Sequence, residues 1–235
     1  WNLRKHRLSQ LLMDYDPSIF GIQEGLLNQV EWIDSTLEKY HYIGVGRDDG
    51  MVKGEFCAIY FDTTYYEVME SSTFWLSDTP NQVSVGWDAA LERICTYGLF
   101  KKKMSGKMVW VFNTHFDHVG TKARKKSSEL IIKKIKELNT QSIPVVLMGD
   151  FNSNPNSDPI KIFKNELQDA LEISSTKLKG PIGTFNAFQR MHMLGNRIDY
   201  IFVKNLKIRS YRHIDDRLNN NQHISDHLPV MITVQ

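Results

Sequence analysis

Apolar residues recur at helical spacing in several stretches of the chain. Leu8, Leu11, Leu12 and Tyr15 follow the i, i+3, i+4, i+7 pattern of an amphipathic helix, and the sequence DYDPS after them favours its end. Similar spacing predicts helices over residues 26–39 and 122–139, and a short helix is expected over 157–166. The apolar faces of the two longer helices are formed by Leu26, Val30, Ile33 and Leu37, and by Leu130, Ile131, Ile135 and Leu138.

Short apolar runs separated by turn sequences predict β-strands between and after these helices. The runs include IFGI, YHYIGVG, EFCAIYF, RICTYGLF, MVWVF and PVVLM, with turn sequences such as RDDG and MSGK between them. The last run, LPVMITV, is rich in β-branched residues and predicts a buried strand at the end of the chain. Many strands with helices among them indicate an α/β protein in which packed sheets have helices on the outside.

Composition and charge limit the function without defining it. The 235 residues are 41% hydrophobic and 24% charged, which is typical of one globular domain, and a net charge of +2 is too small to indicate nucleic-acid binding by itself. Basic residues cluster in 101–107 and 122–136. These clusters are compatible with a basic turn and a solvated helix face, or with a surface that attracts phosphate.

Cys57 and Cys95 lie in apolar runs, so we expect small core residues rather than a disulfide or a metal site. No apolar run reaches the roughly 18 residues of a membrane helix, and we expect a monomer with no membrane span. The sequence begins at Trp1 and leaves open both a cytoplasmic location and export after removal of a signal.

Polar side chains stand at the mouths or kinks of five apolar runs. Each alone has a structural explanation, such as a helix cap for Glu24, an Asx turn for Asp150 or a satisfied core histidine for His115. Together they would be costly, because clustered buried carboxylates need a cation or hydrogen bonds to compensate them. The residues are Gln23 and Glu24, Asn113 and His115, Asp150 and Asn152, Asp199, and Asp226 and His227.

The oxygen donors in this set indicate the cation. Glu24, Asp150, Asn152 and Asp226 offer hard ligands that suit Mg²⁺, with Mn²⁺ as a substitute, whereas zinc prefers more nitrogen or sulfur. With two histidines nearby, such a site can neutralise a phosphoryl oxygen, position a water and support developing charge. We therefore expect a Mg²⁺ or Mn²⁺ site and a phosphate-ester substrate.

Five short motifs occur in order along the chain. QE (23–24), NTHFDH (113–118), GDFN (149–152), RIDYIF (197–202) and SDH (225–227) resemble the ordered motifs of the endonuclease/exonuclease/phosphatase superfamily. FWLSDTP and GWDAALER are similar to sequences of a bacterial branch whose members are mostly uncharacterised hydrolases. The resemblance covers essentially the whole chain, and the order of the five motifs makes it specific.

The resemblance implies a four-layer α/β/β/α sandwich, in which two packed mixed β-sheets are flanked by helices. It also implies a divalent metal and hydrolysis of phosphate esters, with Glu24 as the metal ligand and Asp226 beside it. Residues 1–235 would form a single domain of this family. Because WNLRKHR is similar to the segment that follows the family's first strand, which carries an Asn near the metal, this domain would lack that strand.

The resemblance further implies roles for the remaining polar residues. Asp150 would orient or deprotonate the attacking water, and Asn152 would hold the phosphate or Asp150. His227, paired with Asp199, would stabilise the phosphoryl oxygens during in-line attack. His115 would contact the phosphate.

Two other functions remain open. THFDHVG is similar to the His-x-His-x-Asp-His motif of metallo-β-lactamase-like hydrolases, in which zinc would bind His115 and His118, but Asn113 stands in place of the first histidine. The fold could also carry a catalytically inactive binding module. Bound Mg²⁺ or Mn²⁺ at Glu24 would favour the phosphoesterase, two zinc ions the first alternative, and no metal the second.

The sequence defines the class of substrate less closely than the class of reaction. Superfamily members act on DNA, RNA, inositol phosphates, sphingomyelin and nucleotide-like molecules, and we expect a phosphodiester rather than a monoester, with nucleic acid as one open class. Arg93 could anchor a phosphate through two hydrogen bonds. Asn186, in GTFNAF, could line a pocket or anchor its own loop.

Overall fold

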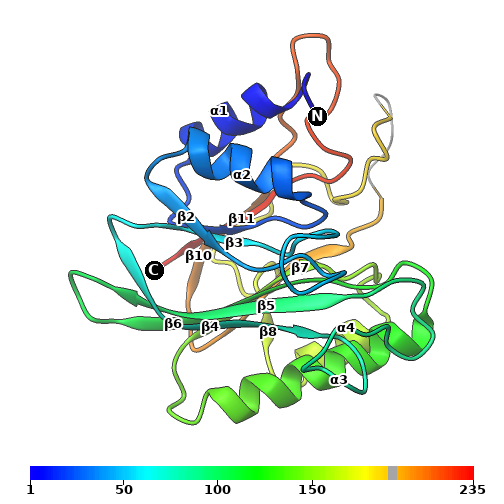
Figure 1. The fold of residues 1–235 in the computed structure, drawn as a ribbon. Helices are drawn as coiled ribbons and strands as arrows, with labels where there is room; N and C mark the ends of the chain where they lie inside the picture. The colour runs from blue at the N-terminus through cyan, green and yellow to red at the C-terminus, as the bar shows by residue number, and fades with distance from the viewer. Residues whose placement is uncertain (190–194) are drawn as a thin grey trace.

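The computed structural model describes residues 1–189 and 195–235, which are arranged in four layers (Figure 1). Helices α1 (Lys5–Tyr15) and α2 (Leu27–Thr36) cover one side of a pair of packed sheets. Helices α3 (Thr121–Leu138) and α4 (Asp158–Lys164) cover the other side. The predicted sandwich of two packed sheets flanked by helices is confirmed, and each expected helix is present with small differences at its ends.

The larger sheet has six strands in the order β4-β5-β6-β7-β9-β8. β6 and β7 are parallel, and the other neighbours are antiparallel. α3 lies between β6 and β7 in the sequence, because a parallel pair needs a long crossover connection. The strands are β4 (Tyr66–Trp75), β5 (Ile94–Lys102), β6 (Met108–His115), β7 (Val145–Asp150), β8 (Gln168–Asp169) and β9 (Asp199–Lys204).

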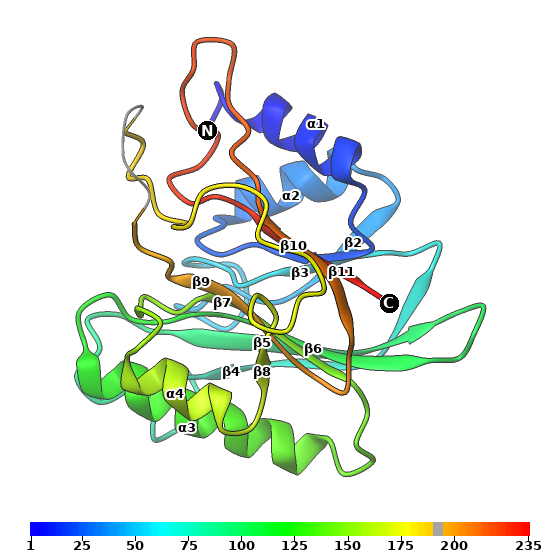
Figure 2. The ribbon, with the colours of Figure 1, turned by 180° about the vertical axis from the view of Figure 1, so that it is seen from behind.

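The other layer of strands consists of two small antiparallel sheets. One has the order β1-β3-β2, and the other pairs β10 with β11. Figure 2, which shows the molecule from behind, agrees with Figure 1 that the two-stranded sheet lies beside β3. The strands are β1 (Ile19–Gly21), β2 (Tyr40–Ile43), β3 (Ile59–Asp62), β10 (Ile208–His213) and β11 (Val230–Val234).

Apolar side chains fill each of the three interfaces between layers. Burying one such side chain contributes about 1.5–3 kcal/mol, so the three cores together fix the sheets relative to each other. Fully buried examples are Val30 and Tyr60 beneath α1 and α2, Ile59 and Phe100 between the sheets, and Phe112, Ile131 and Phe163 beneath α3 and α4.

The structure corrects two details of the sequence analysis. β11 is not buried: Val230 to Ile232 are half-buried, and Thr233 and Val234 are exposed, because β11 belongs to a two-stranded sheet whose other strand is β10. Leu26 was expected on the inner face of a helix but is 49% exposed, because it precedes the first turn of α2.

The two cysteines are core residues, as expected from the sequence. Cys57 and Cys95 are free and buried, and burial raises the pKa of both thiols. None of the helices in the described part of the chain combines the length and the apolar character needed to cross a bilayer.

Candidate active site

Strand register brings three predicted catalytic residues into one row. His115 ends β6, Asp150 ends β7 and Asp199 begins β9. His115 is paired with Asp150 across β6 and β7, and Asp150 is paired with Asp199 across β7 and β9. Because directly paired residues point to the same face of a sheet, the three side chains project together, and all three are buried.

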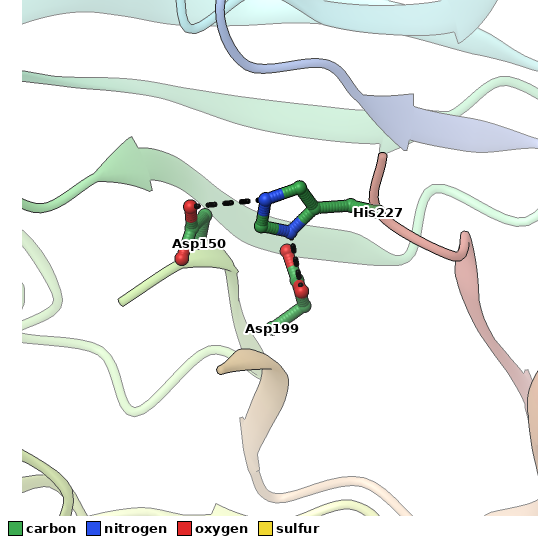
Figure 3. A group of neighbouring side chains, drawn as sticks. All are labelled: Asp150, Asp199 and His227. Carbon is green, nitrogen blue, oxygen red and sulfur yellow. Dashed lines mark hydrogen bonds and ion pairs between the residues drawn. The ribbon is translucent and has the colours of Figure 1, made fainter. Parts of the chain in front are cut away.

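His227 joins this row from the opposite layer of strands. The chain bends at residues 224–226, before β11 begins, so His227 can point toward the larger sheet. Its Nδ1 donates to Asp199 Oδ2 at 2.8 Å, and its Nε2 lies 3.8 Å from Asp150 Oδ2. Figure 3 shows the imidazole between the two carboxylates. The expected contact between Asp199 and His227 is present, and its catalytic role stays a prediction.

The carboxylates determine the charge of His227. Burial alone would lower the pKa of His227, but the hydrogen bond to Asp199 and the surrounding negative charges outweigh burial and raise that pKa to about 9. The imidazole is therefore positively charged at neutral pH. Burial and the negative charge of Asp199 also raise the pKa of the Asp150 carboxyl. A carboxylate with a raised pKa is a better proton acceptor near neutral pH.

Asn152 folds back over Asp150 just beyond β7. Its backbone N–H donates to Asp150 Oδ1 at 2.8 Å, and its side-chain amide donates to Phe116 O at 2.9 Å. The same amide nitrogen lies 3.2 Å from His115 Nε2. The φ of Asn152 is 44°, a left-handed conformation that costs free energy and is common at functional sites. Asn152 therefore contacts both Asp150 and His115.

The His115 ring lies against the Arg93 guanidinium. Arg93 Nη1 lies 3.1 Å from His115 Nδ1 and 3.3 Å from His115 Nε2, and arginine can only donate, so the ring is the acceptor. Burial, and then the positive charge of Arg93, lower the pKa of His115 well below its usual value. His115 is therefore neutral, and its Nε2 lies 3.5 Å from Asp150 Oδ2 and 3.8 Å from Glu24 Oε1.

Asp117 and His118 extend this arrangement, although the phosphoesterase motifs gave them no role. Asp117 is buried and accepts hydrogen bonds from the N–H groups of Val119 and Gly120. Burial opposes ionisation, but these bonds and Arg93 lower the pKa of Asp117 to about 2. Arg93 Nε is 3.3 Å from Asp117 Oδ2, and Arg93 Nη2 is 3.0 Å from His118 Nδ1.

The contacts of Arg93 bear on the zinc alternative. That alternative needs His115 and His118 to share metal ions. Both rings instead contact one guanidinium, and a cation placed there would face a fixed positive charge. The geometry therefore disfavours a zinc pair at these histidines.

Asn113 connects the two layers of strands next to the site. It lies on β6, and its Nδ2 donates to Ile22 O and Ala58 O, each at 2.9 Å. Ile22 comes two residues before Glu24, and His115 comes two residues after Asn113. This amide therefore links the segment before Glu24 to the strand that ends in His115.

The two predicted metal ligands lie at the open side of the row. Glu24 follows β1 with a side chain that is 56% exposed, and Asp226 is half-buried in the bend before His227. Burial, and then the negative charges of Glu55 and Asp226, raise the pKa of Glu24. Glu24 also has a left-handed φ of 58°. Carboxylates that repel one another at an accessible point fit a divalent cation with hard oxygen ligands.

Asp150, Asp199 and His227 each have one ligand atom within 4.8 Å of the others, close enough to hold a metal ion. A protonated imidazole cannot ligate a metal, and His227 already donates to Asp199. The Asp150 carboxylate is thus the member of this group best able to face a cation. Burial, Asp199 and, to a smaller extent, Glu24 raise the pKa of Asp150.

Arg93 and Asn186, the predicted substrate-binding residues, are both buried. Asn186 donates from Nδ2 to Ser225 O at 3.0 Å and from its backbone N–H to Asp226 O at 2.7 Å. These bonds hold the bend that carries Asp226 and His227, in agreement with the loop-anchoring alternative. Contact of either residue with substrate stays a prediction.

Comparisons with known proteins identify the family of the chain. The sequence model of the Endonuclease/Exonuclease/phosphatase family matches residues 1–227. The chain belongs to this family. The resemblance of the five motifs is confirmed, and the protein has the phosphoesterase fold of the endonuclease/exonuclease/phosphatase family.

Solved structures of this family superpose closely on the protein. The mannosyl-6-phosphatase of Bacteroides thetaiotaomicron VPI-5482 has a TM-score of 0.96 at 38% identity, over 100% of this chain and 91% of that chain. A family protein from Bacteroides vulgatus has a TM-score of 0.94 at 37% identity, with coverage of 100% and 91%. The uncharacterized protein L388 of Acanthamoeba polyphaga mimivirus is 25% identical, over 99% of this chain and 91% of its own length.

Proposed function

We propose that the protein is a divalent-metal-dependent phosphoesterase that hydrolyses the phosphate monoester of a sugar. One observation carries this proposal: His115, Asp150 and Asp199 stand in one row, with His227 between the two carboxylates and Glu24 at the open side. The row combines a proton acceptor, Asp150, with a positively charged donor, His227. Both functions assist phosphoryl transfer to water.

Glu24 and Asp226 would hold a Mg²⁺ or Mn²⁺ ion, with Asp150 facing it. When bound, such an ion neutralises negative charge on a phosphoryl oxygen. The donor set fits, because these are hard oxygen ligands and the exposure of Glu24 leaves room for water in the coordination shell.

The chain's own residues then act on the water and the phosphate. Asp150 orients the attacking water and takes its proton, and the N–H of Asn152 fixes the Asp150 carboxylate. His227 directs its Nε2–H at a phosphoryl oxygen, while Asp199 keeps the other ring proton on Nδ1. His115 contacts another phosphoryl oxygen. The bond from phosphorus to the alcohol oxygen breaks on the side opposite the water, and the alcohol leaves with a proton from solvent.

Two considerations favour a monoester over the diester expected from the sequence. A neighbour that is 38% identical over the whole chain is named a mannosyl-6-phosphatase, which supports a sugar phosphate. A monoester also carries close to two negative charges at neutral pH, which suits a site with a charged His227 next to a cation.

A hydrolysis panel tests this proposal. Hexose 6-phosphates and phenyl phosphate are compared with diphenyl phosphate and a short oligonucleotide, each with Mg²⁺, Mn²⁺, Zn²⁺ or a chelator. We expect the monoesters to be hydrolysed with Mg²⁺ or Mn²⁺ and not with the chelator. Hydrolysis of diesters alone would show that the substrate is a phosphodiester and not a monoester. Activity with zinc alone would favour the zinc alternative. No hydrolysis of any ester would favour a binding module.

A further inference from the structure

A small cavity lies beside the proposed site, between the loop of residues 46–55 and the start of β5. Its volume of about 10 Å³ is room for one water-sized group. Glu24 and His115 of the proposed site form part of its wall, so the cavity adjoins the place where the substrate would bind. The cavity is lined by Glu24, Arg47, Glu55, Phe56, Cys57, Arg93, Ile94 and His115.

Hydrogen bonds within the 46–55 loop and from Trp75 of β4 hold this loop in place. The N–H of Arg47 donates to Glu55 O at 3.2 Å, and Trp75 Nε1 donates to Arg47 O at 2.8 Å. The arms of the loop pass so close that a Cβ on Gly46 would lie 2.2 Å from Lys53 O. The loop therefore presents Arg47 and Glu55 to the cavity in one arrangement.

Arg47 and Glu55 form an ion pair through Arg47 Nη1 and Glu55 Oε2. The Arg47 side chain is 11% exposed, and that of Glu55 is 30% exposed. Arg47 Nε is buried and donates no hydrogen bond within residues 1–189 and 195–235, although Asp48 Oδ1 lies 3.5 Å away. Buried donors are normally satisfied, so Arg47 has donor capacity to spare.

The charges around the cavity define the kind of group that it can accept. A second phosphate would be repelled by Glu24 and Glu55, and an apolar group would gain no hydrogen bond from the charged side chains of the wall. A hydroxyl group is water-sized and donates and accepts at the same time. It can therefore donate to Glu55 and accept from Arg47.

We propose that this cavity binds one hydroxyl group of the substrate's alcohol, and that Arg47 and Glu55 thereby select polyol phosphates. The inference rests on the proposed hydrolysis of a sugar phosphate and identifies a hydroxyl of the sugar as the group that the protein recognises. A substrate without that hydroxyl forgoes the hydrogen bonds to Arg47 and Glu55, which then keep only their ion pair. A site built to hydrogen-bond a hydroxyl discriminates strongly against an analogue that lacks it.

The test measures kcat/KM for a series of hexose 6-phosphates, their monodeoxy analogues and phenyl phosphate. Wild-type protein is compared with Glu55→Gln, Arg47→Met and the matched control Lys53→Met, which removes a charge from the exposed part of the same loop. For Glu55→Gln and Arg47→Met we expect the hexose-to-phenyl ratio of kcat/KM to fall about tenfold or more, as for loss of a hydrogen bond to a charged group. For Lys53→Met we expect that ratio to stay within about twofold of wild type.

The deoxy analogues make the test independent of folding. In wild-type protein one monodeoxy analogue should be disfavoured by about tenfold or more, and Glu55→Gln should remove that discrimination. Equal ratios in all four proteins, with phenyl phosphate still hydrolysed, would overturn the inference and leave the proposed function standing. Failure of wild-type protein to hydrolyse any monoester would overturn both.

Discussion

The Asp199 carboxylate accepts a 2.8 Å hydrogen bond from the imidazole of His227, although 28 residues separate the two in the sequence. The bond runs from the first residue of β9, in the larger sheet, to the bend before β11, in the opposite layer. It keeps one ring proton on Nδ1 and raises the pKa of the ring, so the proton on Nε2 is directed toward Asp150 and the open side of the site.

Asp199→Asn should keep the fold and lower kcat on the order of 10²- to 10⁴-fold, because an acid–base group is misoriented. His227→Ala should cost at least as much, and the double variant should be little worse than His227→Ala, because the two residues act as one unit. Single-variant losses in kcat that multiply in the double variant would show that the residues act independently. Thermal unfolding of each variant is the control for folding.

The pH dependence of kcat should follow the charge of His227. Its pKa of about 9 lies above the usual 6.5, so the ring is charged below about 9, and kcat should fall as the pH rises through that value. Asp199→Asn removes the partner that raises this pKa, so the alkaline fall should move to lower pH. Profiles at saturating metal check this, and an alkaline limb at the same pH in both proteins would assign it to another group.

Glu24→Gln should lower the apparent affinity for Mg²⁺ or Mn²⁺ more than it lowers kcat at saturating metal, because it removes a charged ligand and leaves Asp150 in place. Metal titrations of activity and calorimetric titration with Mn²⁺ measure the two effects. Glu137→Gln, on an exposed side chain of α3, is the matched control. Metal dependence that matches wild type would remove Glu24 from the metal site.

Asp169→Asn should destabilise the fold. Arg197 donates to both carboxylate oxygens of Asp169, at 3.1 and 2.6 Å, and both side chains are buried. Removing one partner of a buried pair costs about 3–5 kcal/mol of unfolding free energy, because the other charge stays buried. Urea unfolding measures the loss.

The control for Asp169→Asn is Glu166→Gln, which breaks an exposed pair with Lys136. An exposed ion pair contributes only about 0–1 kcal/mol. Equal losses of unfolding free energy in the two variants would show that the buried Arg197–Asp169 pair contributes no more to stability than the exposed pair.

Local patterns predicted the elements and the site residues, because periodicity and strand ends are properties of neighbouring positions. The spacing of Ile131 and Ile135 located α3, and GDFN located the end of β7. The exposure of β11 had no local signal, since LPVMITV reads the same at the centre of a sheet and at its margin. β8 was missed because two residues, Gln168 and Asp169, are too few to form a pattern.

Contacts between distant segments could not be predicted in the same way. Arg93 precedes His115 by 22 residues, and only the pairing of β5 with β6 brings them together. Arg47 and Glu55 belong to a loop in which RDDG predicted a turn, but the sequence did not show that this turn borders the site. The contacts that the sequence did not show are thus those that depend on strand pairing or on a cavity.

The hydrogen bonds of Asn113 have a consequence for the alignment of the site. Glu24 belongs to one layer of strands and His115 to the other, and the amide of Asn113 links the two layers through hydrogen bonds. Apolar contacts also hold the two layers together, so a change at Asn113 should disturb the alignment of Glu24 and His115 more than it disturbs the helices and strands. Circular dichroism of such a variant would stay close to that of wild type while turnover falls.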